Sequence, residues 1–129
     1  MIYEMRTYDL KPHSIPEVEK RFGEAYEKRK KYSELAAFWH TEIGPLNQII
    51  HVWPYKDLEE RARIRAAAVK DGAWPPKTSE FMMSQRSDIM MPFSFSPELT
   101  LPGLAVKASP GPPVSRATRW VTESRPAQP

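Results

Sequence analysis

The sequence has 129 residues, no cysteine and a formal net charge of +3. This length suits one domain with a single hydrophobic core, and the lack of cysteine excludes disulfides, thiolate metal sites and a cysteine nucleophile. Residues 1–99 carry equal numbers of acidic and basic side chains, so the whole excess of positive charge lies in residues 100–129. A nucleic-acid-binding surface on the folded part is therefore not expected.

The first residues of the chain, Met1 to Arg6, lack the charged and apolar regions of a secretory leader. No apolar run approaches the roughly 20 residues that a membrane-spanning helix needs. We therefore expect a soluble, cytoplasmic protein without a membrane span.

The N-terminal part of the chain predicts a strand followed by a helix. Residues 2–9 alternate loosely between two sets of side chains, as a half-buried strand does. Ser14 and Glu17 have capping-box spacing, and the apolar residues that follow recur at helical spacing to about residue 30. The apolar stripe of this helix should pack on a sheet.

A hairpin and a second helix are predicted next. Residues 35–43 and 47–54 read as two antiparallel strands joined by a turn at Gly44-Pro45-Leu46. A second capping box at residues 57–60 begins a helix that ends at Gly72.

The folded part ends with a short helix over about residues 78–83 and a fourth strand over residues 87–91. The element order is β-α-β-β-α-β, which predicts an α+β fold with a ferredoxin-like sheet and both helices on one face. The uncovered face predicts a homodimer in which two sheets form a dimeric α+β barrel. Residues 1–99 form the predicted domain, and the Pro-rich residues 100–129 form a tail predicted to be disordered, with a docking arm as the alternative.

Residues 1–99 resemble the NIPSNAP family. The resemblance rests on two strands, the hairpin, the start of the second helix and the end of the domain, in residues 3–8, 38–47, 51–53, 55–58 and 93–97, with Arg61, Arg65 and Trp74. It implies a dimeric α+β barrel but no established catalytic activity. One departure is His13, which stands where family members usually have glycine, so we expect a positive φ at a residue that adopts it less readily.

The pattern of the strands predicts which side chains line the barrel interior. Ile50 and Val52 are aliphatic and are predicted to face the helices, which turns His51 and Trp53 toward the interior. The same alternation turns Glu4, Arg6 and Tyr8 inward. For the second strand the pattern does not decide which face lies in the core. One candidate face consists of Ala37, Trp39, Thr41 and Ile43, and the other consists of Phe38, His40 and Glu42.

His51 near Glu4 and Arg6 is a workable acid–base group, with His40 as the other candidate base. The alternative, which we favour, is a structural polar network at the dimer interface. The candidate ligand-binding residues are Trp53, Trp39, Tyr8, Asn47 and Glu42, although Asn47 after the turn favours a turn-closing role.

Arg61 and Arg65 are four residues apart on the second helix, so they share a face and could clamp an anion. Pairing with Asp57, Glu59 or Glu60 on a solvated helix surface is the interpretation that we favour. The three histidines lack metal-motif spacing, so no metal site and no cofactor are expected.

The sequence thus predicts a homodimeric scaffold or a module that binds a small apolar or aromatic molecule. The alternative is a small cofactor-independent enzyme, a monooxygenase or isomerase acting on an aromatic or polyketide-like substrate. In that case His51 or His40 would be the base and Arg6 would hold a developing enolate. A third class, a haem-dependent enzyme, would need a histidine free to ligate iron.

Overall fold

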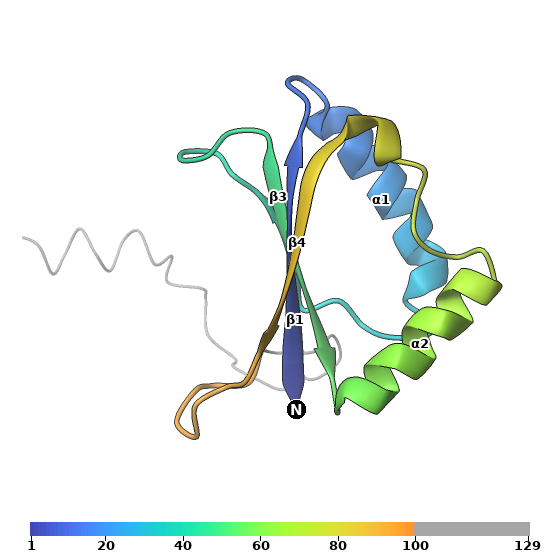
Figure 1. Ribbon diagram of the computed structural model, residues 1–129, viewed down its shortest axis with the longest axis vertical. Coiled ribbons are helices and arrows are strands. Elements are labelled where there is room, and N and C mark those ends of the chain that lie inside the picture. The colour runs from blue at the N-terminus through green and yellow to red at the C-terminus, as the bar shows by residue number, and fades with distance from the viewer. Residues whose placement is uncertain (100–129) are drawn as a thin grey trace, which may run out of the picture.

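A four-stranded antiparallel sheet carries both helices on one face in the computed structural model, which describes residues 1–99 (Figure 1). The strand order is β2-β3-β1-β4, so the predicted ferredoxin-like α+β fold is confirmed. The elements are β1 (Ile2–Leu10), α1 (Ile15–Arg29), β2 (Ala37–His40), β3 (Gln48–Tyr55), α2 (Leu58–Lys70), a 3-10 turn (Ser79–Phe81) and β4 (Met82–Met90). The tail predicted for residues 100–129 lies outside the described residues.

The register between β1 and β3 brings the chemically interesting side chains together. Glu4 pairs with Trp53, and Arg6 pairs with His51. Because paired residues in an antiparallel ladder point to the same side of the sheet, these four side chains share one face. Tyr8, two residues beyond Arg6, lies on that face as well.

The shared face is the one that the helices cover, so the predicted orientation of the strands is wrong. Val18 and Phe22 of α1 pack against Tyr8 and Ile49 in the core. Ile50 has the opposite parity on β3 and therefore lies on the open face, as does Val52. Aliphatic side chains on β3 did not identify the face that the helices cover. The helices instead cover the face with polar side chains, and they do so with aromatic and arginine residues.

The two helices begin differently. The Asp57 carboxylate accepts a hydrogen bond from the backbone amide of Glu60 at 2.8 Å, which confirms the predicted start of α2. The predicted cap at Ser14 is wrong, because the Ser14 hydroxyl donates to the Lys11 carbonyl at 2.6 Å and closes the preceding turn. The helix α1 still begins at Ile15, with Pro16 in its first turn.

Two strands differ in length from their predictions. β4 begins at Met82 instead of residue 87, because pairing with β1 extends to Leu10 through a stretch that has little β-propensity of its own. β2 covers only Ala37–His40, so the connection to β3 is longer than the predicted turn. Within this connection Asn47 has φ 58°, which supports its turn-closing role.

The turn after β1 also uses a left-handed residue. His13 has φ 66°, as the comparison with the usual glycine predicts. No helix in the described part of the chain is long and apolar enough to cross a membrane.

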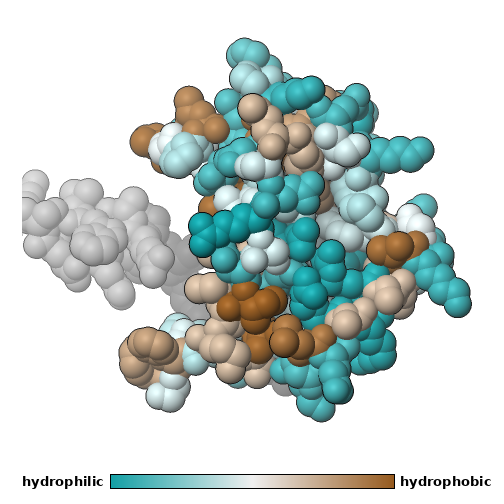
Figure 2. Space-filling model, viewed as in Figure 1, coloured by the Kyte–Doolittle hydropathy of each residue, from teal (hydrophilic) through white to brown (hydrophobic). Residues whose placement is uncertain are grey.

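The open face of the sheet carries exposed apolar side chains. Trp39 is 54% exposed and Met90 is 47% exposed, and no helix among residues 1–99 covers this side (Figure 1). Hydrophobic surface also gathers at the β2–β3 connection and in the loop after β4, on the side away from the helices (Figure 2). Exposed Ile43 and Phe95 belong to these two loops.

Candidate functional site

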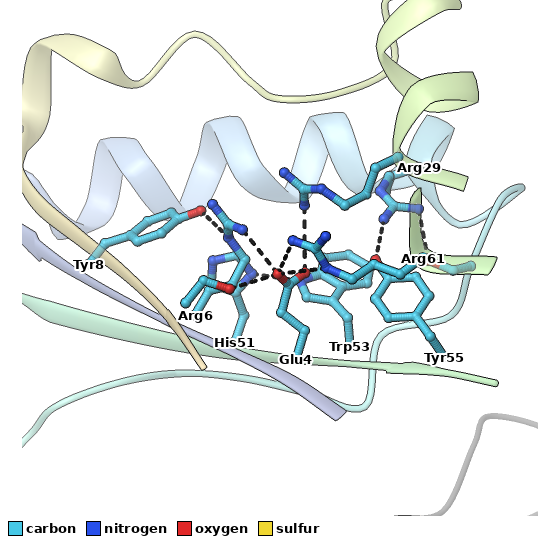
Figure 3. A network of polar contacts seen from close by, with 11 residues as sticks. Glu4, Arg6, Tyr8, Arg29, His51, Trp53, Tyr55 and Arg61 are labelled. Atoms are coloured by element: carbon cyan, nitrogen blue, oxygen red, sulfur yellow. Dashed lines mark hydrogen bonds and ion pairs between the residues drawn. The ribbon is translucent and has the colours of Figure 1, made fainter. Parts of the chain in front are cut away.

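A single buried carboxylate is surrounded by arginines on the helix-covered face (Figure 3). Glu4 is 0% exposed, and its Oε2 accepts hydrogen bonds from Arg61 Nε at 3.0 Å and from Ser87 Oγ at 2.7 Å. Arg6 Nη1 lies 3.3 Å from the same oxygen, and Arg65 Nη1 lies 3.6 Å from Oε1. We call Glu4, Arg6, Arg61, Arg65 and Ser87 the Glu4 cluster.

The Glu4 cluster keeps its carboxylate ionised. Burial acts to raise the pKa of Glu4, but the hydrogen bonds from Arg61 and Ser87 and the charge of Arg6 outweigh it, so this pKa lies below its ordinary value. Three arginines therefore face one negative charge, which leaves an excess of two positive charges in the cluster.

Arg29, at the end of α1, adds a further buried positive charge. It is 1% exposed and donates to Tyr55 Oη at 2.9 Å and to Ser33 Oγ at 2.7 Å. Its guanidinium carbon lies 4.7 Å from the ring centre of Trp53 and 5.9 Å from that of Trp74. No carboxylate of the described residues forms an ion pair with it, and burial lowers the pKa of Arg29 despite the opposing effect of Tyr55.

His51 is held neutral in an aromatic environment. Its ring is 0% exposed, stacks on Phe38 with 4.5 Å between ring centres and meets the edge of Tyr8 at 4.9 Å. Burial, with the charge of Arg6, lowers the pKa of His51 to about 3. Nδ1 accepts a hydrogen bond from Trp53 Nε1 at 2.7 Å, so the single proton of the neutral ring lies on Nε2, which has no partner among residues 1–99.

An aromatic cavity of about 210 Å³ lies between α1 and the β2–β3 side of the sheet. Phe22, Tyr26, Phe38, Trp53 and Trp74 form most of its wall. The exposed side chains of Glu19 and His40 also line it, which gives the cavity a polar edge.

A second cavity, of about 270 Å³, lies on the other side of Phe22 and Trp74, which line both. Arg6, Arg65 and Tyr8 are among its lining residues, so we call it the arginine cavity. Its remaining polar wall comes from β4 and the loop before it, with Gln85, Thr78 and Ser79.

The structure brings together five of the candidate residues and separates the others. Glu4, Arg6, Tyr8, His51 and Trp53 lie on the helix-covered face (Figure 3). Arg6 joins Glu4 to Tyr8, and Trp53 is hydrogen-bonded to His51.

The remaining candidates lie in or beside the hairpin. Trp39 pairs with Ile50, is 54% exposed and is also among the residues that line the aromatic cavity. Glu42 is exposed in the β2–β3 connection, 3.4 Å from His40 Nε2. His40 pairs with Ile49 and therefore lies on the helix side of β2. This decides the question that the sequence left undecided, since Phe38 and His40 belong to the face that the helices cover.

The favoured pairing of Arg61 and Arg65 is wrong. Both residues share a face of α2, as their spacing predicts, but that face turns to the sheet and pairs with Glu4 rather than with acids of α2. Sequence reasoning also missed Arg29, because it read the basic run at residues 28–31 as a solvated helix end. Arg29 follows Val18 and Phe22 at helical spacing, which was the signal for its burial.

Comparison with known proteins identifies the family. A sequence model of the NIPSNAP family matches residues 3–97. The chain belongs to the NIPSNAP family. A NipSnap homolog of Dictyostelium discoideum is 38% identical over 94 residues, which cover 70% of this chain and 42% of that protein. NipSnap homolog 1 of Danio rerio is 33% identical over 74% of this chain and 36% of its own length, so this NIPSNAP chain spans about two fifths of these curated relatives.

Solved structures give the same family and fold. Protein Atu4242 of Agrobacterium tumefaciens, described as a NIPSNAP family protein of unknown function, matches with 37% identity and a TM-score of 0.71, covering 75% of this chain and 98% of that one. A candidate antibiotic biosynthesis monooxygenase of Nitrosomonas europaea matches with 9% identity and a TM-score of 0.58 over 74% of this chain and 93% of that one. The second likeness concerns the fold alone.

Metal ligands are not grouped in the described part of the chain. No three His, Asp or Glu side chains among residues 1–99 lie close enough to hold an ion. The chemistry of the described site is therefore that of arginines, one carboxylate, a neutral imidazole and aromatic rings.

Proposed function

We propose that this NIPSNAP protein is a homodimeric module that binds a small aromatic or apolar molecule in the aromatic cavity. The observation that carries the proposal is an unfilled space of about 210 Å³ walled mostly by the aromatic side chains of Phe, Tyr and Trp residues. Such walls offer ring edges and faces to a flat ligand. A cytoplasmic location stays a prediction from the sequence.

The size of the cavity limits the ligand. A cavity of about 150 Å³ accommodates benzene, whereas drug-sized ligands need about 300 Å³ or more. The aromatic cavity lies between these values, so its ligand has one ring with a short substituent. The exposed edge near Glu19 and His40 is where a polar substituent would reach water.

Catalysis is the second candidate function, and His40 rather than His51 is the base that it needs. The only lone pair of a neutral His51 ring is engaged by Trp53, and the low pKa makes His51 a poor proton acceptor. His40 lines the aromatic cavity, and its Nε2 lies 3.4 Å from the Glu42 carboxylate, which could orient the ring. A cofactor-independent reaction on an aromatic substrate would then begin with proton removal by His40.

The homodimer is supported by the open face. Trp39 and Met90 are exposed on its two edge strands, β2 and β4, and the neighbouring loops carry exposed Ile43 and Phe95. A second copy that packs its own open face here would cover these side chains and complete a two-sheet barrel. Sedimentation-velocity ultracentrifugation of the full chain tests this, since a monomer at micromolar concentration would contradict it.

Binding of neutral one-ring compounds tests the main proposal. Ligand-detected NMR with phenol, 4-methylphenol and benzyl alcohol should show saturable binding to the full chain. Phe38→Trp would fill part of the aromatic cavity and should weaken binding at least about tenfold, since the ligand loses its space. Phe93→Trp, at an exposed loop position, is the matched control and should bind as the unchanged chain does.

Two results would contradict the binding proposal. One is that none of the three compounds binds, and the other is that Phe38→Trp binds them as well as Phe93→Trp. If binding holds, His40→Gln separates the candidates, because a pure binding module keeps its affinity and has no turnover to lose.

A further inference from the structure

We infer that the arginine cavity is a binding site for an oxyanion, the carboxylate or phosphate group of a small molecule, with Arg6 and Arg65 as its ligands. This site is distinct from the aromatic cavity, and the inference goes beyond the proposed function. It rests on the charge balance of the Glu4 cluster, on the free donors of two arginines and on the lining of the cavity.

The Glu4 cluster holds more positive than negative charge, and its three arginine side chains are largely shielded from water, at 16%, 26% and 32% exposed. Glu4 forms ion pairs with three arginines, and Arg29 contributes a fourth positive charge that also acts on the same region. Buried charges that lack an opposite charge destabilise a folded protein. An additional anion among these groups would reduce the excess of positive charge.

The two arginines that line the cavity retain unused donors. Arg6 donates from Nε to the Tyr8 hydroxyl at 2.7 Å and from Nη1 to Glu4, which leaves its Nη2 free among the described contacts. Arg65 lies 3.6 Å from Glu4, too far for a hydrogen bond, so its fork of donors is not committed. A guanidinium fork of this kind matches the geometry of a carboxylate or phosphate.

The lining of the cavity suits an anion with an apolar body. None of its lining side chains in the described part of the chain is acidic, and Thr78, Ser79 and Gln85 add neutral polar groups. Trp74 and Phe22 form an apolar wall opposite these polar groups. At about 270 Å³ the cavity has room for an oxyanion group attached to a short carbon framework.

Isothermal titration of the full chain with sodium benzoate, sodium acetate and inorganic phosphate tests the inference. At least one of these probes should bind saturably, with affinity that falls as salt is added. Binding of the carboxylates alone identifies a carboxylate ligand, and binding of phosphate alone identifies a phosphate ligand. Absence of binding by all three at low salt overturns the inference.

Substitutions on one helix locate the site. Arg65→Gln removes a cavity donor and should weaken binding at least about tenfold, the loss expected for one charge-assisted contact. Arg63→Gln is the matched control, because Arg63 is on the same helix but 74% exposed, and it should change the affinity less than twofold. Equal losses in the two variants would indicate unspecific attraction by net charge and would overturn the inference.

A second variant guards against loss of the fold. Gln85→Glu places a carboxylate in the arginine cavity from an exposed position on the edge strand β4, so the fold should tolerate it. Its negative charge should compete with the oxyanion and abolish binding, while unfolding curves remain close to those of the unchanged chain. Undiminished oxyanion binding in a folded Gln85→Glu variant contradicts the inference.

Neutral 4-methylphenol keeps the two proposals apart. Arg65→Gln should bind it normally, because Arg65 does not line the aromatic cavity. Conversely, Phe38→Trp should bind the oxyanion probes normally. Failure of either proposal would therefore leave the other intact.

Discussion

The two faces of the sheet differ in chemistry although they are built from the same strands. The helix-covered face contains the buried Glu4 with its arginines, whereas an ion pair of the open face, between Arg86 and Asp88, is at an edge strand with Arg86 75% exposed and Asp88 29% exposed. The open face also carries apolar side chains such as Trp39, and at one end Asp9 accepts hydrogen bonds from Gln48 and Ser84. The difference shows that a fully buried carboxylate occurs where α2 brings arginines to the strand, whereas the polar groups of the open face stay in reach of water.

Removal of the Glu4 charge should give the largest effect. Glu4→Gln leaves three arginines without an anion at a fully buried position, so the free energy of unfolding should fall by about 3–5 kcal/mol. Urea denaturation followed by tryptophan fluorescence measures this. Asp88→Asn is the control, because its partner Arg86 is 75% exposed, and it should cost less than about 1 kcal/mol.

Acid should destabilise the helix-covered face through His51. The pKa of His51 is about 3 in the folded protein and about 6.5 in an unfolded chain, so the unfolded state binds the proton more readily. Stability is therefore full above about pH 6.5 and falls by roughly 1.4 kcal/mol per pH unit below it, or about 2 kcal/mol at pH 5.

Urea titrations at several pH values check this slope. The depressed pKa of Glu4 adds a further loss of stability only at lower pH, as that carboxylate takes up a proton. His51→Gln should flatten the slope between pH 6.5 and 5, whereas His40→Gln, at an exposed histidine, should retain it. An unchanged slope in His51→Gln would show that another group is responsible.

A charge on the open face should affect association rather than folding. Trp39→Asp would bring a carboxylate into the proposed apolar interface and should weaken the dimer by about 2 kcal/mol or more, as at interface hot spots. Sedimentation velocity over a dilution series measures the shift. Leu58→Asp makes the same kind of change at an exposed position on α2, and a similar weakening there would argue against the open face as the interface.

The smallest effect is expected at the start of α2. Asp57→Ala removes the side-chain acceptor for the Glu60 amide and should lower the free energy of unfolding by about 1 kcal/mol. Thermal unfolding by circular dichroism checks it. Ser14→Ala is an informative comparison, because Ser14 does not cap α1 and its loss should act on the turn at Lys11 instead.

Sequence patterns correctly predicted the features of the fold that depend on residues close together in the chain. The order of elements, the start of α2 and the left-handed backbone at His13 follow from local signals, and the structure confirms them. The length of β4 did not follow, because residues 82–86 pair with β1 across most of the chain. The prediction of which strand face the helices cover was wrong because Ile49 on one face and Ile50 on the other are equally apolar, so hydrophobicity alone could not distinguish the two faces.

The candidate site shows the same division. Alternation along β1 and β3 correctly placed Glu4, Arg6, His51 and Trp53 on one face. The arginines that cover these side chains could not be predicted from the pattern. Arg61 pairs with Glu4, which is 57 residues away, and no local rule connects the two. A charged residue inside a strand that alternates between two faces indicates that the element covering it supplies an opposite charge.

Phe22 and Trp74 separate the aromatic cavity from the arginine cavity and belong to the wall of both. A ligand that pushes either ring aside enlarges one space at the expense of the other. If both proposed ligands bind, occupancy of the two cavities would be linked by negative cooperativity, and thermodynamic reciprocity would require each ligand to weaken the other by the same factor. Under both proposals the protein would respond to the ratio of two small molecules rather than to the concentration of either one.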